Sequence, residues 1–181
     1  AIADADLFIV DDGAGGTNRK TTAARLKTYV GNMTPSFLAF LGQDAAQAQN
    51  SSTKIAFNVE MYDNSSVYDN SSNYRFTPGV AGKYYIFATV GAYGGSRGYK
   101  QITAIRKNGT MIVQHGEEID LTTAWTAGFT RTQSISVVDI ADADDYYEVW
   151  VLARLASSGN VTIDYNANLP YSHFGAFRII E

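Results

Sequence analysis

The sequence predicts an all-β protein, an antiparallel sandwich of the jelly-roll type that follows a short strand, turn and helix. Its 181 residues include 16 glycines, 12 tyrosines and 9 phenylalanines, but only 3 prolines. This composition is typical of many short strands joined by polar turns. Several stretches also alternate apolar and polar residues with a period of two, and clusters of Gly, Asn, Asp and Ser separate them.

The first elements are a strand over residues 6–11, the glycine-rich stretch DDGAGGTNRK and a helix that begins at Thr21. This stretch is not a phosphate-binding loop, because Arg19 stands where the motif needs a glycine before Lys20. It is not the dinucleotide-binding turn either, since Asn18 stands in place of the third glycine. What remains is a small unit that must pack on something else.

Glycine, asparagine and proline follow this helix and mark a boundary. We therefore expect a connector, residues 1–34, and a jelly-roll head domain, residues 35–181. In the head, SFLAFLG predicts a short strand and QDAAQAQNSST a polar loop. The next stretch, KIAFNVEMYD, predicts a strand with Phe57, Val59 and Met61 on one face.

The stretch YRFTPGVAGKYYIFATVGAYGG predicts a Pro-Gly turn between two strands. In the second strand, Tyr84 and Ile86 face one side, whereas Tyr85 and Phe87 face the other. The later stretch YYEVWVLARL is also apolar on both sides, interrupted only by Glu148. A lone sandwich covers only one face of each sheet, so two-sided strands indicate a second burial partner, most simply a neighbouring copy of the chain.

Asn108 and Gly109 lie between two alternating runs and predict a two-residue β-hairpin, because both residue types tolerate positive φ. Further strands are predicted in FTRTQSISVVDI, YYEVWVLARL and HFGAFRIIE. The acidic turn ADADD and the hairpin-like segment SSGNVTIDYNANLPYS separate them. Strands at this spacing favour a sandwich of the Greek-key or jelly-roll type.

Taken in order, these segments resemble the globular head of the first complement component (subcomponent q), a trimeric jelly roll related to tumour necrosis factor. The matching pieces are the aromatic strand of residues 82–87, the Lys-Asn-Gly hairpin of residues 107–109 and the final strand of residues 174–177. Their order and spacing agree over residues 36–181. The resemblance implies a homotrimer. The aromatic residues expected in its core or in the seam between copies are Phe57, Phe76, Tyr84, Tyr85, Phe87, Trp150, Phe174 and Phe177.

The first thirty residues resemble short segments near the start of bacteriophage fibre and other virion proteins, where an Asp-rich strand, a Lys-Thr turn and a brief helix join trimeric pieces. This resemblance implies that residues 1–34 attach the head to other virion proteins. The residues expected to make the attachment are Leu7, Phe8, Val10, Leu26 and Tyr29. The sequence shows no collagen-like stalk, secretion signal or cysteine, so the defence and hormone roles of the animal proteins are not carried over.

Charge and composition exclude several partners. The net charge is −4 and the basic residues are scattered, so neither nucleic acid nor an anionic membrane is expected to bind. No apolar run approaches the roughly 18 residues that span a bilayer. The lack of cysteine excludes disulfides and thiolate metal sites. Neither of the two histidines, His115 and His173, has a partner at metal-ligand spacing, so no cofactor is expected.

No enzymatic activity is expected, because the sequence lacks the Gly-x-Ser-x-Gly elbow of many hydrolases. Glu117, Glu118 and Asp120 are candidates for a carboxylate pair that cleaves polysaccharide, but a solvated loop is the simpler interpretation. The aspartates of residues 142–145 lack the glycine and distal glutamate of a calcium loop. A charged turn is the simpler interpretation there, with a bound calcium ion as the open alternative.

Aromatic residues in predicted loops favour recognition of carbohydrate or protein at the surface. The candidates are Tyr93, Arg97, Tyr99, Trp125, Tyr165 and Tyr171. An equal alternative is that about half of them close the ends of the sandwich or line the seam between copies.

The sequence therefore predicts a non-enzymatic bacteriophage virion protein, a homotrimeric knob joined to a particle that is assembled in the bacterial host cytoplasm. A fibre tip that binds host-surface carbohydrate or protein is the leading interpretation, since three copies of each loop add weak contacts by avidity. Capsid decoration or cement is the alternative, favoured by the lack of a fibrous shaft in these residues. A polysaccharide depolymerase and a secreted binding protein are further alternatives.

Overall fold

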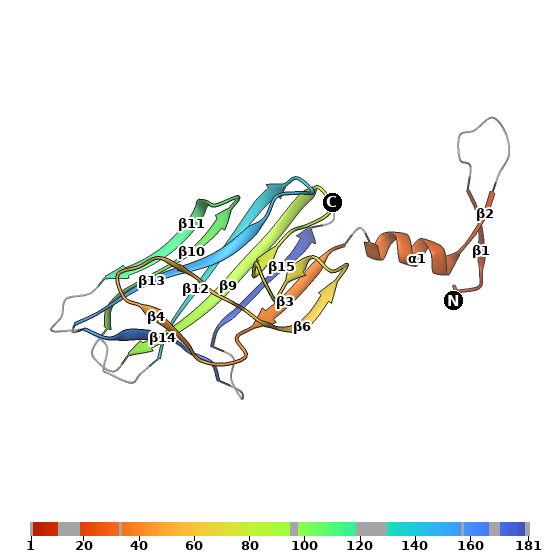
Figure 1. Cartoon of the computed structure of the whole chain (residues 1–181). Helices are drawn as coiled ribbons and strands as arrows, with labels where there is room; N and C mark the ends of the chain where they lie inside the picture. Colours follow the sequence, from red (N-terminus) through yellow and green to blue (C-terminus); the bar gives the residue numbers. More distant parts are fainter. Residues whose placement is uncertain are drawn as a thin grey trace.

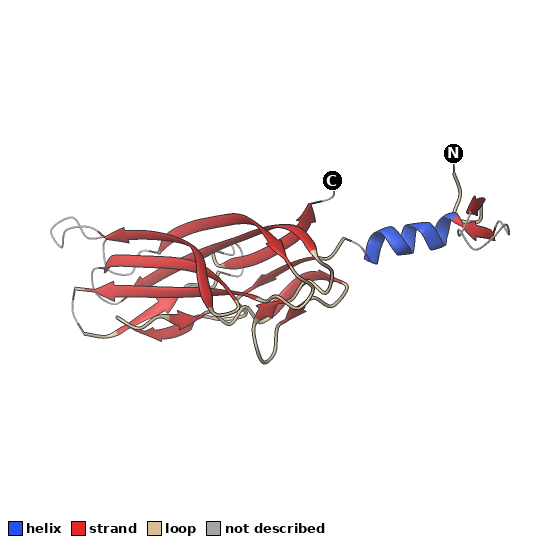
Figure 2. Ribbon diagram, turned by 90° about the horizontal axis from the view of Figure 1, so that it is seen from above, coloured by secondary structure: helices blue, strands red, loops and turns tan. Residues whose placement is uncertain are grey.

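Two antiparallel β-sheets lie face to face and form the head, and a β-hairpin and a helix project from one end of it (Figure 1 and Figure 2). The computed structural model describes residues 2–10, 19–32, 34–94, 98–118, 130–156, 158–166 and 171–179, with the backbone alone at residues 32, 98 and 99. This architecture is the jelly-roll sandwich that the sequence predicts, so the predicted fold class is confirmed.

The first sheet has seven strands, in the order β4, β14, β9, β15, β3 and β6, with β12 on the other edge of β9. The strands are β3 (Ser36–Phe40), β4 (Ala45–Ala48), β6 (Val59–Asn64), β9 (Gly82–Gly94), β12 (Arg131–Ala141), β14 (Asn160–Ile163) and β15 (His173–Ile179). β9 organises this sheet, because it pairs with β15 and then β14 along one edge and with β12 along the other.

The second sheet has six strands, in the order β11, β10, β13, β8 and β7, with β5 also paired to β13. The strands are β5 (Thr53–Lys54), β7 (Tyr68–Asp69), β8 (Arg75–Phe76), β10 (Gly98–Lys107), β11 (Thr110–Glu118) and β13 (Tyr147–Leu155). The predicted hairpin between β10 and β11 is confirmed, since Asn108 and Gly109 have φ angles of 51° and 79°. Asn108 also donates to Asp145 Oδ1 at 2.6 Å, which ties the hairpin to the acidic turn.

Aromatic rings fill the space between the sheets. Phe37 on β3 has no exposed surface, and its ring centroid lies 4.5 Å from that of Tyr68 and 5.0 Å from that of Phe76. Phe174 on β15 meets the same ring edge-on at 5.0 Å. Phe37 is therefore the centre of the aromatic core, where strands from both sheets meet.

β9 has the two-sided pattern that the sequence predicts. Tyr84 and Ile86 are fully buried in the core, whereas Tyr85 and Phe87 are half-buried on the opposite face of the sheet. The inner residues hold the two sheets of one chain together. The outer residues remain available for a contact outside the head.

The N-terminal arm differs from the prediction at the start of its helix. Its three elements are β1 (Leu7–Val10), β2 (Arg19–Thr22) and α1 (Ala23–Asn32). β1 and β2 pair as a hairpin that places Thr21, the predicted first residue of the helix, opposite Phe8. The helix begins two residues later, at Ala23, where Thr22 Oγ1 accepts a hydrogen bond from the Arg25 N–H at 3.3 Å and caps it.

Two predictions near the start of the head were also wrong. The stretch predicted to be a polar loop contains β4 and the first residue of β5, because pairing with β14 and β13 overrides its low apolar content. Phe57 is fully buried, but Val59 and Met61 are 46% and 67% exposed. A register shift between β3 and β6 and the start of β6 only at Val59 break the simple alternation that was predicted.

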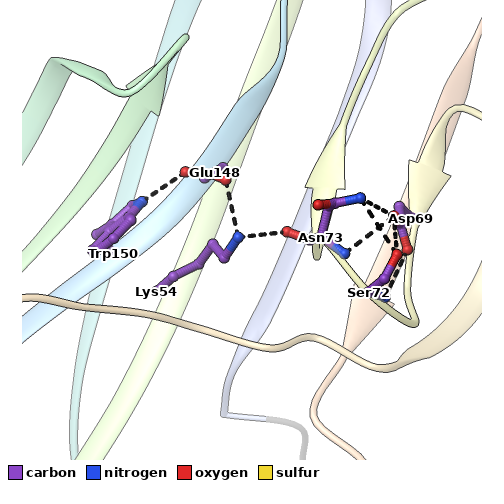
Figure 3. Close-up of polar contacts among 6 residues, drawn as sticks. All are labelled: Lys54, Asp69, Ser72, Asn73, Glu148 and Trp150. Atoms are coloured by element: carbon purple, nitrogen blue, oxygen red, sulfur yellow. Dashed lines mark hydrogen bonds and ion pairs between the residues drawn. The ribbon is translucent and has the colours of Figure 1, made fainter.

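Polar contacts link the second sheet to the loop after β7 (Figure 3). Glu148 on β13 is almost buried and accepts hydrogen bonds from Lys54 Nζ at 3.1 Å and from Trp150 Nε1 at 3.0 Å. Lys54 also donates to the carbonyl oxygen of Asn73 at 2.8 Å. One lysine thus neutralises a nearly buried carboxylate and fixes the loop against the sheet.

Asp69 gives this loop its shape. Its carboxylate accepts hydrogen bonds from the backbone N–H and the side chain of Ser71, Ser72 and Asn73, at 2.7 to 3.2 Å. These donors hold the pKa of Asp69 well below its usual range, and the two from Ser72 have the largest effect. The loop is therefore built around an ionised carboxylate.

Asp69→Asn is expected to lower the melting temperature at neutral pH, because an amide offers one acceptor oxygen where the carboxylate offers two. A carboxyl whose pKa is lowered in the folded state stabilises the fold above its unfolded pKa and loses that contribution as the pH falls. The difference between variant and wild type should therefore be constant above about pH 5 and shrink below about pH 4. Circular dichroism melting curves check this, and an undiminished difference near pH 3 would contradict it.

Candidate assembly face and loop end

Aromatic side chains cover the outer face of the seven-stranded sheet. Strand register places Phe177 beside Tyr85, and their ring centroids are 5.4 Å apart. Phe87 follows at 5.7 Å from Tyr85, and His173 lies 6.2 Å from both Phe87 and Phe40. We name this surface, formed by Phe40, Tyr85, Phe87, His173 and Phe177, the aromatic face. It crosses three neighbouring strands, β9, β15 and β3.

Gly175 makes room for the central ring of the aromatic face. A Cβ atom at this position would lie 2.5 Å from Phe87 Cζ and 3.0 Å from the carbonyl oxygen of Phe37. Either the ring or the strand would have to move to accommodate a larger residue. The glycine therefore lets Phe87 occupy the space over β15.

A groove of about 470 Å³ opens on this face. It is lined by Tyr85, Phe87, Ala88, Thr89, Ser134, Ile135, Ser136 and Phe177. The hydroxyl oxygens of Thr89 and Ser134 are 2.9 Å apart along its side. Farther along β12, Val138 and Ile140 are 56% and 69% exposed. An apolar centre bordered by hydroxyl groups is the usual composition of a protein interface.

The aromatic residues predicted for the core or the seam fall into three places. Those buried between the sheets are Phe57, Phe76, Tyr84 and Phe174. Those on the aromatic face are Tyr85, Phe87 and Phe177. Trp150 belongs to neither group, because it lies with Glu148 and Arg106, whose guanidinium carbon is 4.1 Å from the indole centroid. The structure therefore separates residues that the sequence pattern had placed in one set.

Two of the predicted recognition residues meet at the end of the sandwich where β9 ends. The hydroxyl of Tyr93 donates to Asp44 Oδ2 at 2.8 Å, and the backbone N–H of Tyr165 donates to Asp44 Oδ1 at 2.8 Å. The hydrogen bond to Asp44 raises the pKa of Tyr93. We name this group, Asp44, Tyr93 and Tyr165, the loop end. Asp44 was missed because it lies in a stretch that looks like an unstructured polar loop.

The other recognition candidates are placed only in part. Tyr171 is half-buried, and a Cβ at Gly91 would lie 2.9 Å from its Cβ, so it packs against β9. Tyr99 lies on β10, and only the backbone of this residue is described. Arg97 and Trp125 lie outside the described residues. The recognition surface therefore stays a prediction.

The acidic candidates pair with basic residues. Glu117 contacts Arg131, and Glu118 lies 2.6 Å from Lys100, which lowers the pKa of Glu118. Asp120 lies outside the described residues. In the acidic turn, burial disfavours the charge of Asp145, but Lys107 at 2.9 Å holds its pKa below the usual value. No group of three or more potential metal-ligating side chains occurs in the part of the chain that the structure describes.

The projecting arm carries the residues predicted to attach the head. Leu7 is 60% exposed and Tyr29 is 66% exposed, with Val10 and Leu26 also at the surface. Phe8 is half-buried within the hairpin. Apolar side chains at this exposure have little to pack on in a single chain. No helix among the described residues is both long and apolar enough to cross a membrane.

Solved structures with the same fold include a complement globular domain, murine APRIL and an insect TNF. The globular domain of zebrafish complement 1qA matches with a TM-score of 0.55 at 15% identity, over 82% of this chain and 98% of that one. Murine APRIL matches at 0.57 and 7% identity, over 81% and 99%. Eiger TNF from S. frugiperda matches at 0.52 and 9% identity, over 82% and 92%. No protein-family model matches the sequence, and no match was found among curated proteins.

The head is therefore a jelly-roll sandwich with the fold of complement heads and tumour necrosis factor-like proteins. The resemblance noted for residues 36–181 is confirmed at the level of the fold. At these identities the likeness concerns the fold alone, because one fold carries many functions. The resemblance of the first thirty residues to virion connectors stays a prediction.

Proposed function

We propose that this protein is a non-enzymatic structural component of a bacteriophage particle, present as a homotrimer of jelly-roll heads. Residues 1–34 join each trimer to other virion proteins, and the loop end binds the host surface. The observation that carries the proposal is the aromatic face. Its apolar side chains lie on the outer side of the sheet, where a single chain covers them only in part.

A closed ring of three copies would bury this face. A cyclic assembly gives every copy the same interface, so Tyr85, Phe87 and Phe177 of each chain are covered without leaving an open end. The exposed apolar residues Val138 and Ile140 on β12 continue the same surface and supply the contact with the next copy. Serine and threonine hydroxyls along the groove then form the polar border of the interface.

The arm supports attachment to a particle. It stands away from the head in both views (Figure 1 and Figure 2), and its apolar residues are exposed. The segment before β1 is bonded to the start of the helix, since the N–H groups of Ala23 and Ala24 donate to carbonyl oxygens of Asp6 and Asp4 at 2.9 and 3.1 Å. A projecting unit with its own hydrogen bonds and an uncovered apolar surface is suited to docking on another protein.

The loop end lies away from the arm and supports host binding. β9 starts near the arm and ends beside Tyr93, so Tyr93 and Tyr165 are carried at the far end of the head (Figure 1). The Tyr93 hydroxyl on the Asp44 carboxylate and the 39% exposed side chain of Tyr165 offer hydrogen-bonding groups together with apolar area, which suits a carbohydrate or protein surface. Three copies in one trimer would multiply a weak contact by avidity.

Deletion of residues 1–30 is expected to leave a folded head that no longer joins the particle, because the head makes its own core. The measurement is complementation of particles that lack the protein with the full or the shortened chain, followed by immunogold electron microscopy. The position of the label also separates a fibre tip from the capsid. Incorporation of the shortened chain at the normal level would contradict the role of the arm.

A further inference from the structure

Helix α1 has an apolar stripe that the chain leaves exposed. Ala23, Leu26 and Val30 are spaced three and four residues apart, so they lie along one side of the helix. Leu26 is 37% exposed and Val30 is 55% exposed. Thr28 lies on the opposite side, because successive residues turn by about 100° around the helix axis. We name Ala23, Leu26 and Val30 the helix stripe.

The helix is too short to be stable without a packing partner. Its ten residues span about 15 Å, and isolated helices of this length are marginal in water. Carbonyl oxygens of Asp4 and Asp6 accept hydrogen bonds from N–H groups of its first turn, but Leu26 and Val30 stay exposed. The stripe therefore needs an occupant from outside the chain.

The position of the arm identifies that occupant. The chain enters the seven-stranded sheet beside the aromatic face: the Arg178 N–H donates to the carbonyl oxygen of Pro35 at 3.2 Å, and Ser36 pairs with Phe177. Only residues 33–35 separate the helix from β3, a distance of at most about 14 Å between residues 32 and 36. In a trimer closed through the aromatic face, the three helices leave from the same border of the shared interface.

We propose that the helix stripes of the three copies pack together as a short parallel bundle, continuous with the interface between the heads. This inference rests on the proposed trimer. The heads hold the three helices close together, which raises their effective concentration and compensates for the short stripe. Each Leu26 and Val30 is then covered by the same residues of the two other copies.

The bundle divides the apolar surface of the arm between two roles. Leu26 and Val30 are used between copies, whereas Leu7, Ile9 and Val10 of the hairpin stay exposed beyond the bundle. Three hairpins held on one axis present a threefold surface to the particle. Leu26 thus serves attachment by positioning the hairpins and not by touching the virion partner.

Single-cysteine crosslinking of the full-length protein tests the bundle, because the natural sequence contains no cysteine. Leu26→Cys and Val30→Cys place one thiol in the stripe, and Thr28→Cys places it on the opposite side of the helix as the matched control. A disulfide needs Cα atoms within about 7 Å. Copper-phenanthroline oxidation should link up to about two thirds of the stripe variants' chains as dimers, one pair in each trimer.

The control is expected to give at least about fivefold less dimer, since its thiols point away from the threefold axis. The mass of each variant is measured by light scattering before oxidation. Trimers in which Thr28→Cys links as well as the stripe variants, or in which the stripe variants do not link, overturn the bundle and leave the trimer standing. Single chains overturn both.

Discussion

Phe87→Asp is expected to convert the proposed trimer into separate folded chains. Phe87 lies at the centre of the aromatic face, where its ring contacts Tyr85 and occupies the space over Gly175. A carboxylate there would have to be buried without a partner when copies associate, which costs several kcal/mol for each chain. In the single chain the same carboxylate still reaches water, because Phe87 points away from the core.

Light scattering at several protein concentrations measures this change, and circular dichroism checks the fold. The matched control is Leu152→Asp, which changes a half-buried leucine on the outer face of the second sheet. The control should remain a trimer. A folded Phe87→Asp protein that keeps the wild-type mass would refute burial of the aromatic face between copies.

Phe37→Ala is expected to lower the free energy of unfolding by about 3 to 5 kcal/mol. Phe37 has no exposed surface, and its ring packs against Tyr68, Phe76 and Phe174. Those three residues belong to three other strands, so the cavity left by alanine cannot close by moving one side chain. The loss of ring contacts adds to the loss of buried apolar area.

Urea unfolding at one fixed protein concentration gives this difference, since assembly makes the apparent stability depend on concentration. Phe37→Leu is the control, because a side chain of nearer volume should cost less than half as much. A change below about 1 kcal/mol for Phe37→Ala would show that the aromatic core is not the main source of stability.

The strongest local patterns predicted the fold well. Tyr84 and Ile86 alternate with Tyr85 and Phe87, and this period of two fixes both faces of β9 without knowledge of its neighbours. Asn108 and Gly109 fix a hairpin through their backbone preferences alone. In each case the residues that determine the structure are neighbours in the sequence, so their types alone predict the local conformation.

The missed features depend on partners far away in the sequence. β4 consists of alanine and glutamine and lacks the β-branched residues that are common in strands. It forms a strand because β14 pairs with it. Asp44 gains its role only when Tyr93 and Tyr165 are brought beside it. Lys54 and Glu148 likewise meet across the fold. No spacing rule within the sequence could have joined these residues.

The most direct test of the account is the mass of the intact protein by sedimentation equilibrium at low micromolar concentration and neutral pH. Burial of the aromatic face between copies predicts a single species of three chains, each of 19.7 kDa. A well-behaved species with the mass of one chain would contradict the trimer, the threefold arm and the avidity of the loop end together.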